Sequence, residues 1–386
     1  MDRPPIDFIA RESGPMSNHL LHRIHIAALI SAAGALPAVA LAADSPATTL
    51  AQILANSGIT ESGYVAASYY DSSGYNTDHE FDTSHDTFQL DEAGLQLAYQ
   101  PKSGFGAVVD VIAGQDAKIV DGAESAGASA NSFDLLQGFV QYVTGPLTVQ
   151  AGKFTTLAGA EVIAPTGNTN FSRSLLFYAE PLTHTGVRAT YAVTDTVSVI
   201  VGVNNGWNYT KIDYGSKTGE LGVAYNPNKY FSLTAQMYAG KDPVYGAERT
   251  FFDTVATFNA TSALTFVLSY DWGKQEISTA TPDTLTGGDW DGVAAYANYQ
   301  INSKWRVSLR GEYLDDKDGT TVVTGSPQDL KEATLTFGYD PVASFELRLE
   351  GRYDTSSEPT FLKAETPVVQ YGSNQSEVAI QGVYKF

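Results

Sequence analysis

The segment FELRLEGRYD, residues 345–354, alternates between two kinds of side chain. Its odd positions are Phe, Leu, Leu, Gly and Tyr, and its even positions are Glu, Arg, Glu, Arg and Asp. Successive side chains of a β-strand point to opposite faces, so this period of two predicts a strand with one apolar and one charged face. The row of charged side chains needs water, whereas the other face suits hydrocarbon.

The same alternation runs through most of the chain. Residues 305–313 and 264–272 show it clearly, and residues 197–204 show it with Ile200 breaking the polar set. We count sixteen such segments, at 62–70, 87–100, 104–113, 132–143, 147–153, 182–193, 197–207, 216–226, 230–239, 249–260, 263–273, 289–300, 304–313, 330–340, 344–354 and 373–386.

The connections between these segments are of two kinds. Those after even-numbered segments are short and rich in turn-forming residues, as at 101–103, 144–146 and 227–229. Those after odd-numbered segments are mostly long, as at 71–86 and 154–181. An even strand number with short turns on one side and long loops on the other is typical of bacterial outer-membrane barrels.

We therefore expect an all-β fold over residues 62–386. It is a closed antiparallel transmembrane barrel of about 16 strands (between about 14 and 18), with short periplasmic turns and long extracellular loops. A soluble sandwich of this size would leave sheet edges to protect, whereas closure pairs every backbone group as lipid requires. The last segment ends in Phe386, as the final strands of such barrels generally do, although an edge strand of a soluble sheet could end so too.

The beginning of the chain fits an export signal. Residues 26–42 are apolar, follow a basic residue and end in an A-x-A pattern, which predicts a secretory signal peptide cleaved after Ala42. Residues 1–15 fit no part of such a signal, so we expect translation to start at Met16; the alternative is that they belong to a long n-region of the signal peptide. Residues 43–61 then form a short periplasmic segment.

The composition excludes several classes of protein. The chain has 386 residues, no cysteine and a formal net charge of -20. Removal of the signal takes away three basic and three acidic residues, so the mature net charge stays the same. Nucleic-acid binding favours a basic face and is not expected. Secreted domains often rely on disulfides, and their absence here indicates that another constraint holds the fold together.

Polar residues opposite the apolar rows are candidates to line a pore. A field between acidic and basic walls would filter ions and orient dipolar solutes. The alternative is that Glu and Arg on neighbouring strands simply pair and hold the wall rigid. We assign to the lumen Glu92, Gln96, Asp110, Arg188, Thr190, Glu220, Gln236, Asp271, Arg306, Arg310, Glu312, Glu346, Arg348, Glu350 and Arg352.

The longest connection, residues 154–181, is the candidate constriction. It contains apolar residues that bulk water would solvate poorly, and long loops are commonly functional. Folding into the lumen would place Glu161, Arg173 and Glu180 near the narrowest point. The alternative is a surface loop that packs on its neighbours or at a subunit contact.

Other chemistry is sparse. There is no Walker A loop and no G-x-G-x-x-G motif after a strand, so no cofactor is expected. His184 stands alone near the start of a strand, which favours a structural role over catalysis, and no catalytic residue is expected. Asp315, Asp316 and Asp318 are clustered as calcium ligands can be, but they lack the spacing of an EF-hand, and a solvated acidic loop is the alternative.

Several short runs point to a family. They are 62–65 (SGYV), 88–93 (FQLDEA), 136–142 (LQGFVQY), 151–154 (AGKF), 170–174 (NFSRS) and 184–189 (HTGVRA). Together they resemble the β-barrel porin-2, or OmpL-like, family over roughly residues 59–386, and best over 63–191. The resemblance implies an outer-membrane pore and brings no catalytic residues and no defined substrate.

We therefore expect a Gram-negative outer-membrane porin, a water-filled channel for passive diffusion of small hydrophilic solutes or ions with a weak preference for cations. Its expected partners are outer-membrane lipids, these solutes and, by analogy with other porins, two further copies in a homotrimer. Two alternatives stay open. One is a barrel-anchored surface receptor or adhesin with a plugged lumen, and the other is an outer-membrane enzyme.

Overall fold

The computed structural model describes residues 56–124, 130–212, 215–242, 246–276, 287–321, 325–364 and 369–386. The expected signal peptide, the start at Met16, the cleavage after Ala42 and most of the segment 43–61 lie outside these ranges. In the described part of the chain, no helix is both long and apolar enough to cross a membrane.

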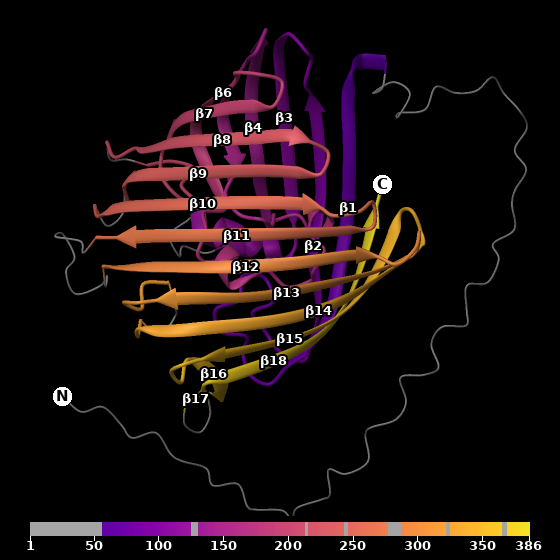
Figure 1. Cartoon of the computed structure of the whole chain (residues 1–386), viewed down its shortest axis with the longest axis vertical. Helices are drawn as coiled ribbons and strands as arrows, with labels where there is room; N and C mark the ends of the chain where they lie inside the picture. The colour runs from indigo at the N-terminus through magenta and orange to yellow at the C-terminus, as the bar shows by residue number, and fades with distance from the viewer. Residues whose placement is uncertain are drawn as a thin grey trace, which may run out of the picture. The chain divides into compact units, whose positions relative to one another are not determined.

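Sixteen of the described strands form one closed antiparallel barrel (Figure 1). Each strand pairs with its neighbours in the sequence, and β18 pairs with both β15 and β1 to close the ring. The barrel strands are β1 (Ile59–Ser72), β2 (Thr87–Tyr99), β3 (Gly104–Ala113), β4 (Phe133–Thr144), β5 (Leu147–Thr155), β6 (Thr183–Ala192), β7 (Val197–Asn204), β8 (Thr218–Asn228), β9 (Phe231–Lys241), β10 (Glu248–Asn259), β11 (Leu264–Gln275), β12 (Gly288–Gln300), β13 (Trp305–Asp316), β14 (Gln328–Val342), β15 (Phe345–Ser356) and β18 (Asn374–Lys385).

The predicted fold class is therefore confirmed, and the predicted strand bounds are right to within a few residues. The short elements inside the loops were not predicted, because each is too short to carry a periodic pattern. They are α2 (Gln115–Glu124), the 3-10 turn η1 (Pro165–Gly167), α3 (Leu175–Tyr178) and the hairpin of β16 (Phe361–Ala364) with β17 (Gln370–Gly372).

Exposure alternates along the strands as the sequence pattern does. On β15, Leu349 and Tyr353 are each 51% exposed, whereas Arg348 and Glu350 between and beside them are at most 2% exposed. The exposed side chains form an apolar outer surface suited to lipid, and the charged ones point into the barrel. The two-residue period thus sets which side chains meet the membrane and which meet the interior.

The seam of the barrel is closed by main-chain pairing up to the end of the chain. The register of β1 with β18 runs from Tyr64 opposite Lys385 to Ser72 opposite Glu377. Beyond it, Gly63 and Phe386 exchange two main-chain hydrogen bonds of 3.0 and 2.9 Å. Phe386 thereby takes part in closing the barrel. This agrees with the interpretation of the segment that ends in Phe386 as the final barrel strand and not as the edge of a soluble sheet.

Two paired glycines lie where the backbones of strands β4 to β7 approach closely. Gly152 of β5 lies opposite Gly186 of β6 and has a φ of +139°, a conformation that other residues rarely adopt. A Cβ at Gly152 would lie 2.2 Å from the carbonyl oxygen of Gly138, and one at Gly186 would lie 2.2 Å from that of Val203. Backbone atoms cannot give way as side-chain ends do, so both positions require glycine.

We expect Gly152→Val to destabilise the barrel by at least about 1–3 kcal/mol, the usual cost of one strained backbone position. The measurement is the urea midpoint of the protein folded in detergent. Gly351→Val is the matched control, because a Cβ at Gly351 meets no atom within 4 Å. Equal midpoints for the two variants would contradict this account of Gly152.

Candidate functional site

The loop between β5 and β6, residues 156–182, lies inside the barrel and is called the inner loop here. Its main-chain amides donate to carboxylates that point inward from the wall. Phe171 and Ser172 donate to Glu350 at 2.7 and 2.9 Å, and Leu175 and Leu176 donate to Glu312 at 3.0 and 3.3 Å. The structure therefore places the predicted loop 154–181 in the lumen rather than on the surface.

Arginines of the same wall bind the main-chain carbonyls of the inner loop. Arg310 donates to Ser172 at 2.8 Å, Arg348 to Pro165 at 3.0 Å and Arg352 to Arg173 at 2.6 Å. Arg306 donates to the carbonyl of Thr169. Strands β13 to β15 and the inner loop thus form one hydrogen-bonded unit.

This unit corrects one expectation from the sequence. The row of Glu346, Arg348, Glu350 and Arg352 was expected to face water, but each of the four is at most 4% exposed. The polar main chain of the inner loop supplies the hydrogen bonds that water would otherwise supply. A charged face can therefore be buried in a membrane barrel when a loop folds onto it.

The alternative reading, in which Glu and Arg pair along the wall, describes much of this lining. Arg188 donates to both carboxylate oxygens of Glu220 at 2.9 and 3.0 Å. Arg310 lies 3.1 Å from Glu332, and both Arg306 and Arg348 pair with Glu346. Buried arginines with such partners are neutralised locally, so they contribute little net positive field to the interior.

The three residues predicted for the constriction have different surroundings. Glu161 accepts from the amide of Ser174 at 2.6 Å and pairs with Arg310 at 2.8 Å. Arg173 is 2% exposed and donates to three carbonyls of the inner loop, those of Val162, Ile163 and Phe171. Both residues therefore hold the loop in shape, and Glu161 also borders the cavity described below.

Glu180, the third predicted constriction residue, differs from Glu161 and Arg173 because it lies beside carboxylates of the barrel wall. It is 6% exposed, and its Oε2 atom has no hydrogen-bond partner. Burial, and next the charge of Asp253, raise the pKa of Glu180 well above its usual value. Of the predicted lining residues, Asp271 belongs to this same cluster.

A cavity of about 400 Å³ remains on the other side of the inner loop. Its wall side is formed by polar residues of β2, β3 and β4, and its loop side is mainly apolar. Within it, Asp110 accepts hydrogen bonds from Gln96 at 3.0 Å and Gln137 at 3.1 Å. Leu157 and Val162 of the inner loop are 40% and 48% exposed, although they lie inside the barrel. The lining includes Gln96, Asp110, Gln137, Thr155, Leu157, Glu161, Val162, Ala164 and Leu182.

Two further insertions share the interior with the inner loop. They are α2 and the connection between β1 and β2, residues 73–86, called the first loop here. Phe81 of the first loop, Val120 of α2 and Phe177 of the inner loop belong to one buried apolar cluster. Three separate loops thus pack against one another within the barrel.

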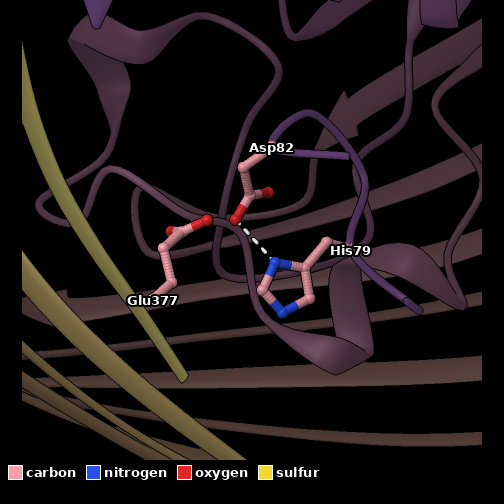
Figure 2. Close-up of side chains that lie close together, drawn as sticks. All are labelled: His79, Asp82 and Glu377. Carbon is pink, nitrogen blue, oxygen red and sulfur yellow. Dashed lines mark hydrogen bonds and ion pairs between the residues drawn. The ribbon is translucent and has the colours of Figure 1, made fainter. Parts of the chain in front are cut away.

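His79 anchors the first loop to the barrel wall, a role that was not predicted. Its Nδ1 lies 2.6 Å from Asp82 of the same loop, and its Nε2 lies 3.0 Å from Asp354 of β15. Figure 2 shows the ring of His79 facing Asp82, with Glu377 of β18 beside them. A histidine in a long loop gives no sequence signal for such a contact, because its partner Asp354 is 275 residues away.

The charges around His79 set its protonation. Burial and the nearby Arg352 lower the pKa of His79, but Asp82 and Asp354 outweigh them and raise it above its usual value. The same contact with His79 lowers the pKa of Asp82 against the effect of burial. Gln375 also lies 3.0 Å from the His79 Nε2 atom. The charged imidazolium is therefore the form that ties the first loop to the wall.

The remaining predicted residues are not gathered into a site. His184 is fully buried, bonds the carbonyl of Gly206 at 3.1 Å and stacks on Tyr238 with 4.6 Å between ring centres, which fits a structural role. Among the described residues, Asp315, Asp316 and Asp318 do not converge as metal ligands would. Asp316 instead accepts from the amides of its own loop at 2.7 Å.

Glu92 also points into the barrel and is fully buried, and it accepts a hydrogen bond from the hydroxyl of Tyr64. Like the arginines of β13 to β15, it is bound to a neighbour within the protein.

Comparison with known proteins identifies the sequence family. Residues 57–386 match the family described as "Putative beta-barrel porin-2, OmpL-like". No protein with curated annotation shows significant sequence similarity to the chain.

Solved outer-membrane proteins share the fold. The trimer form of OmpT from Vibrio cholerae superposes with a TM-score of 0.56 at 11% identity, covering 85% of this chain and 99% of its own. The channel DcaP of Acinetobacter baumannii gives 0.55 at 14% identity, with 85% and 97% covered. OprB of Pseudomonas putida at high pH gives 0.58 at 12% identity, with 86% and 96% covered. At such identities the likeness is one of fold.

We expect the stability of the barrel to contain a component that depends on His79. Because the pKa of His79 is raised on folding, this component is fully present below the usual histidine pKa near 6.5 and is lost as the pH rises through the native value. The measurement is limited proteolysis of the first loop, with the urea midpoint, across this pH range. His79→Gln should be cleaved faster at low pH and should lose the pH-dependent component.

His85→Gln is the matched control, since His85 lies exposed in the same loop. It should keep the wild-type profile. If His79→Gln also kept that profile, the ion pairs of His79 would not anchor the loop.

Proposed function

This chain belongs to the family "Putative beta-barrel porin-2, OmpL-like", and we propose that small hydrophilic solutes and ions cross it through the cavity beside the inner loop. The protein is an outer-membrane β-barrel of a Gram-negative bacterium with a channel role. The observation that carries the proposed path is the cavity of about 400 Å³ between the inner loop and strands β2 to β5. The inner loop occupies the lumen beside this cavity and leaves a narrow passage along β2 to β5, and so acts as the constriction.

The path favours cations. Asp110 faces the cavity, and among the described ion pairs none neutralises it. The arginines that could attract anions are paired elsewhere: Arg188 with Glu220, and Arg310 with Glu161 and Glu332. Arg173 is enclosed by carbonyls of its own loop. The passage therefore carries an acidic side chain without a matching basic one.

We also infer that the barrel assembles as a homotrimer. The trimer form of OmpT from Vibrio cholerae supports this by its shared fold. The exposed apolar outer surface would serve for contact with other copies as well as with outer-membrane lipids.

A second candidate function is suggested by the loops that fill the interior of the barrel. The first loop, α2 and the inner loop share one apolar cluster inside the barrel. A barrel filled in this way could anchor the long loops of a surface receptor or adhesin without conducting. Planar-bilayer recording separates the two, since an anchor would show no unitary current.

For the channel, we expect unitary currents and a reversal potential in a KCl gradient that shows cation preference. A unit charge about 4 Å from a permeating ion contributes about 1 kcal/mol in water, so Asp110→Asn should lower the cation-to-anion permeability ratio by roughly fivefold. Asp195→Asn, in an exposed periplasmic turn, is the control and should leave the ratio unchanged. Anion preference in the wild type would show that the arginines, not Asp110, govern the narrow part.

A test of the path itself uses size in place of charge. Val162→Trp should lower the unitary conductance strongly, because the larger side chain would fill part of the cavity that Val162 lines. Val201→Trp makes the same change at a position that is 50% exposed on β7 and faces outward. Conductances reduced equally in both variants, or in neither, would place the path elsewhere.

A further inference from the structure

Three carboxylates meet where the inner loop returns to the barrel wall. Glu180 comes from the end of the inner loop, and Asp253 of β10 and Asp271 of β11 lie opposite each other in register. One oxygen atom from each of the three lies within 4.8 Å of the others. Glu180 is 6% exposed, and the other two are fully buried.

Among the described residues, the cluster has no basic partner. Five of its carboxylate oxygens have no hydrogen bond of normal geometry: Oε2 of Glu180 and both oxygens of Asp253 and of Asp271. Among the ion pairs of the described residues, none includes any of the three. Native structures rarely leave buried polar atoms unsatisfied, and so many in one place point to a ligand.

A neutral polar group is directed at the same place. The hydroxyl of Ser269 is 1% exposed, has no hydrogen-bond partner of normal geometry and faces the carboxylate of Asp253. Ser269 and Asp271 are two residues apart on β11, so both point inward. An oxygen atom outside the acidic cluster is thus also aimed into it without a hydrogen bond of normal geometry.

The surroundings make three free anions unfavourable. Ala179 precedes Glu180, and Phe251 lies two residues before Asp253 on the same face of β10. Both belong to a buried apolar cluster that also contains Trp290 and Leu176. Burial of unpaired carboxylates in such a setting is strongly unfavourable unless a cation or protons neutralise them.

We propose that Glu180, Asp253 and Asp271 bind a single divalent cation, with the hydroxyl of Ser269 as a further oxygen donor. All donors are hard oxygen atoms, which suits Ca²⁺ in preference to the metals that favour nitrogen or sulfur ligands. Three carboxylates with no basic partner also supply the negative charge that such an ion requires.

A second buried group of close acidic and histidine side chains in the described part of the barrel differs in this respect. His79, Asp82 and Glu377 also lie close together (Figure 2). There, both ring nitrogens of His79 are bound by carboxylates, and Arg352 pairs with Asp354 at 2.9 Å. This cluster contains its own cations, whereas the cluster of Glu180 contains none.

The cation site would hold both ends of the inner loop. Gly159, near the start of the loop, lies so close to Glu180 that a Cβ there would be 1.9 Å from its Oε2 atom. The backbone of Gly159 also faces Asp253. A bound ion would therefore tie the loop to β10 and β11, in addition to its hydrogen bonds to β13 and β15.

The test uses the full-length barrel refolded in detergent without lipopolysaccharide, so that surface cations bridging lipid do not interfere. After treatment with EDTA, Ca²⁺ binding is measured by titration calorimetry, and Tb³⁺ binding by luminescence excited through tryptophan. We expect one Ca²⁺ per chain and a urea midpoint that rises with Ca²⁺. Asp253→Asn and Asp271→Asn should each weaken binding by more than about tenfold, since ligand charge sets calcium affinity.

Glu180→Gln keeps the wall intact and tests the site if the wall variants fail to fold. Asp315→Asn, which removes an acidic residue outside the cluster, should bind Ca²⁺ as the wild type does. The proposal is overturned if the wild type shows no saturable Ca²⁺ binding, or if Glu180→Gln binds it with unchanged affinity. Shared protons would then neutralise the cluster. The binding measurement does not involve conductance, so its outcome is independent of the proposed channel path.

Discussion

The pairing of every main-chain amide and carbonyl is the constraint on which the rest of the structure depends. Hydrocarbon offers no hydrogen bonds, so a sheet in a membrane must close on itself. Here closure runs through β1 and β18 and extends to the last residue, where Gly63 and Phe386 exchange two hydrogen bonds. A cylinder closed in this way turns one face of every strand inward, and that face must then be satisfied by water, by ions or by other parts of the chain.

In this barrel the chain itself satisfies much of the inner face. Glu312 and Glu350 accept hydrogen bonds from main-chain amides of the inner loop. In turn, the carbonyls of this loop accept hydrogen bonds from Arg310, Arg348 and Arg352. Each wall residue thus binds the complementary group of the loop backbone, so a loop of ordinary polarity fits against a strongly charged wall. The charged row and the inner loop depend on each other, since either alone would leave buried polar groups without partners.

The fold was predictable from the sequence because its signals are local. Alternation in 345–354 and the short turns at 101–103 and 144–146 report strand faces and connections without reference to distant residues. The burial of Glu346 and Arg348 was not predictable, because it depends on a loop more than 160 residues earlier, as the contact of Arg348 with Pro165 shows. The contact of His79 with Asp354 and the proximity of Glu180 to Asp253 were not predictable either, because these residues are also far apart in the sequence. Their residue types are ordinary, and only the closed barrel brings them together.

The inner loop is bound to β13, β14 and β15, whereas the cavity adjoins β2, β3 and β4. The proposed passage is therefore off-centre, and the residues that border it on the wall are largely separate from those that hold the loop in place. Substitutions along β2 to β4 would then alter which solutes pass while the anchoring contacts stay unchanged. Such a division of the wall lets selectivity diverge among descendants of one barrel without loss of folding.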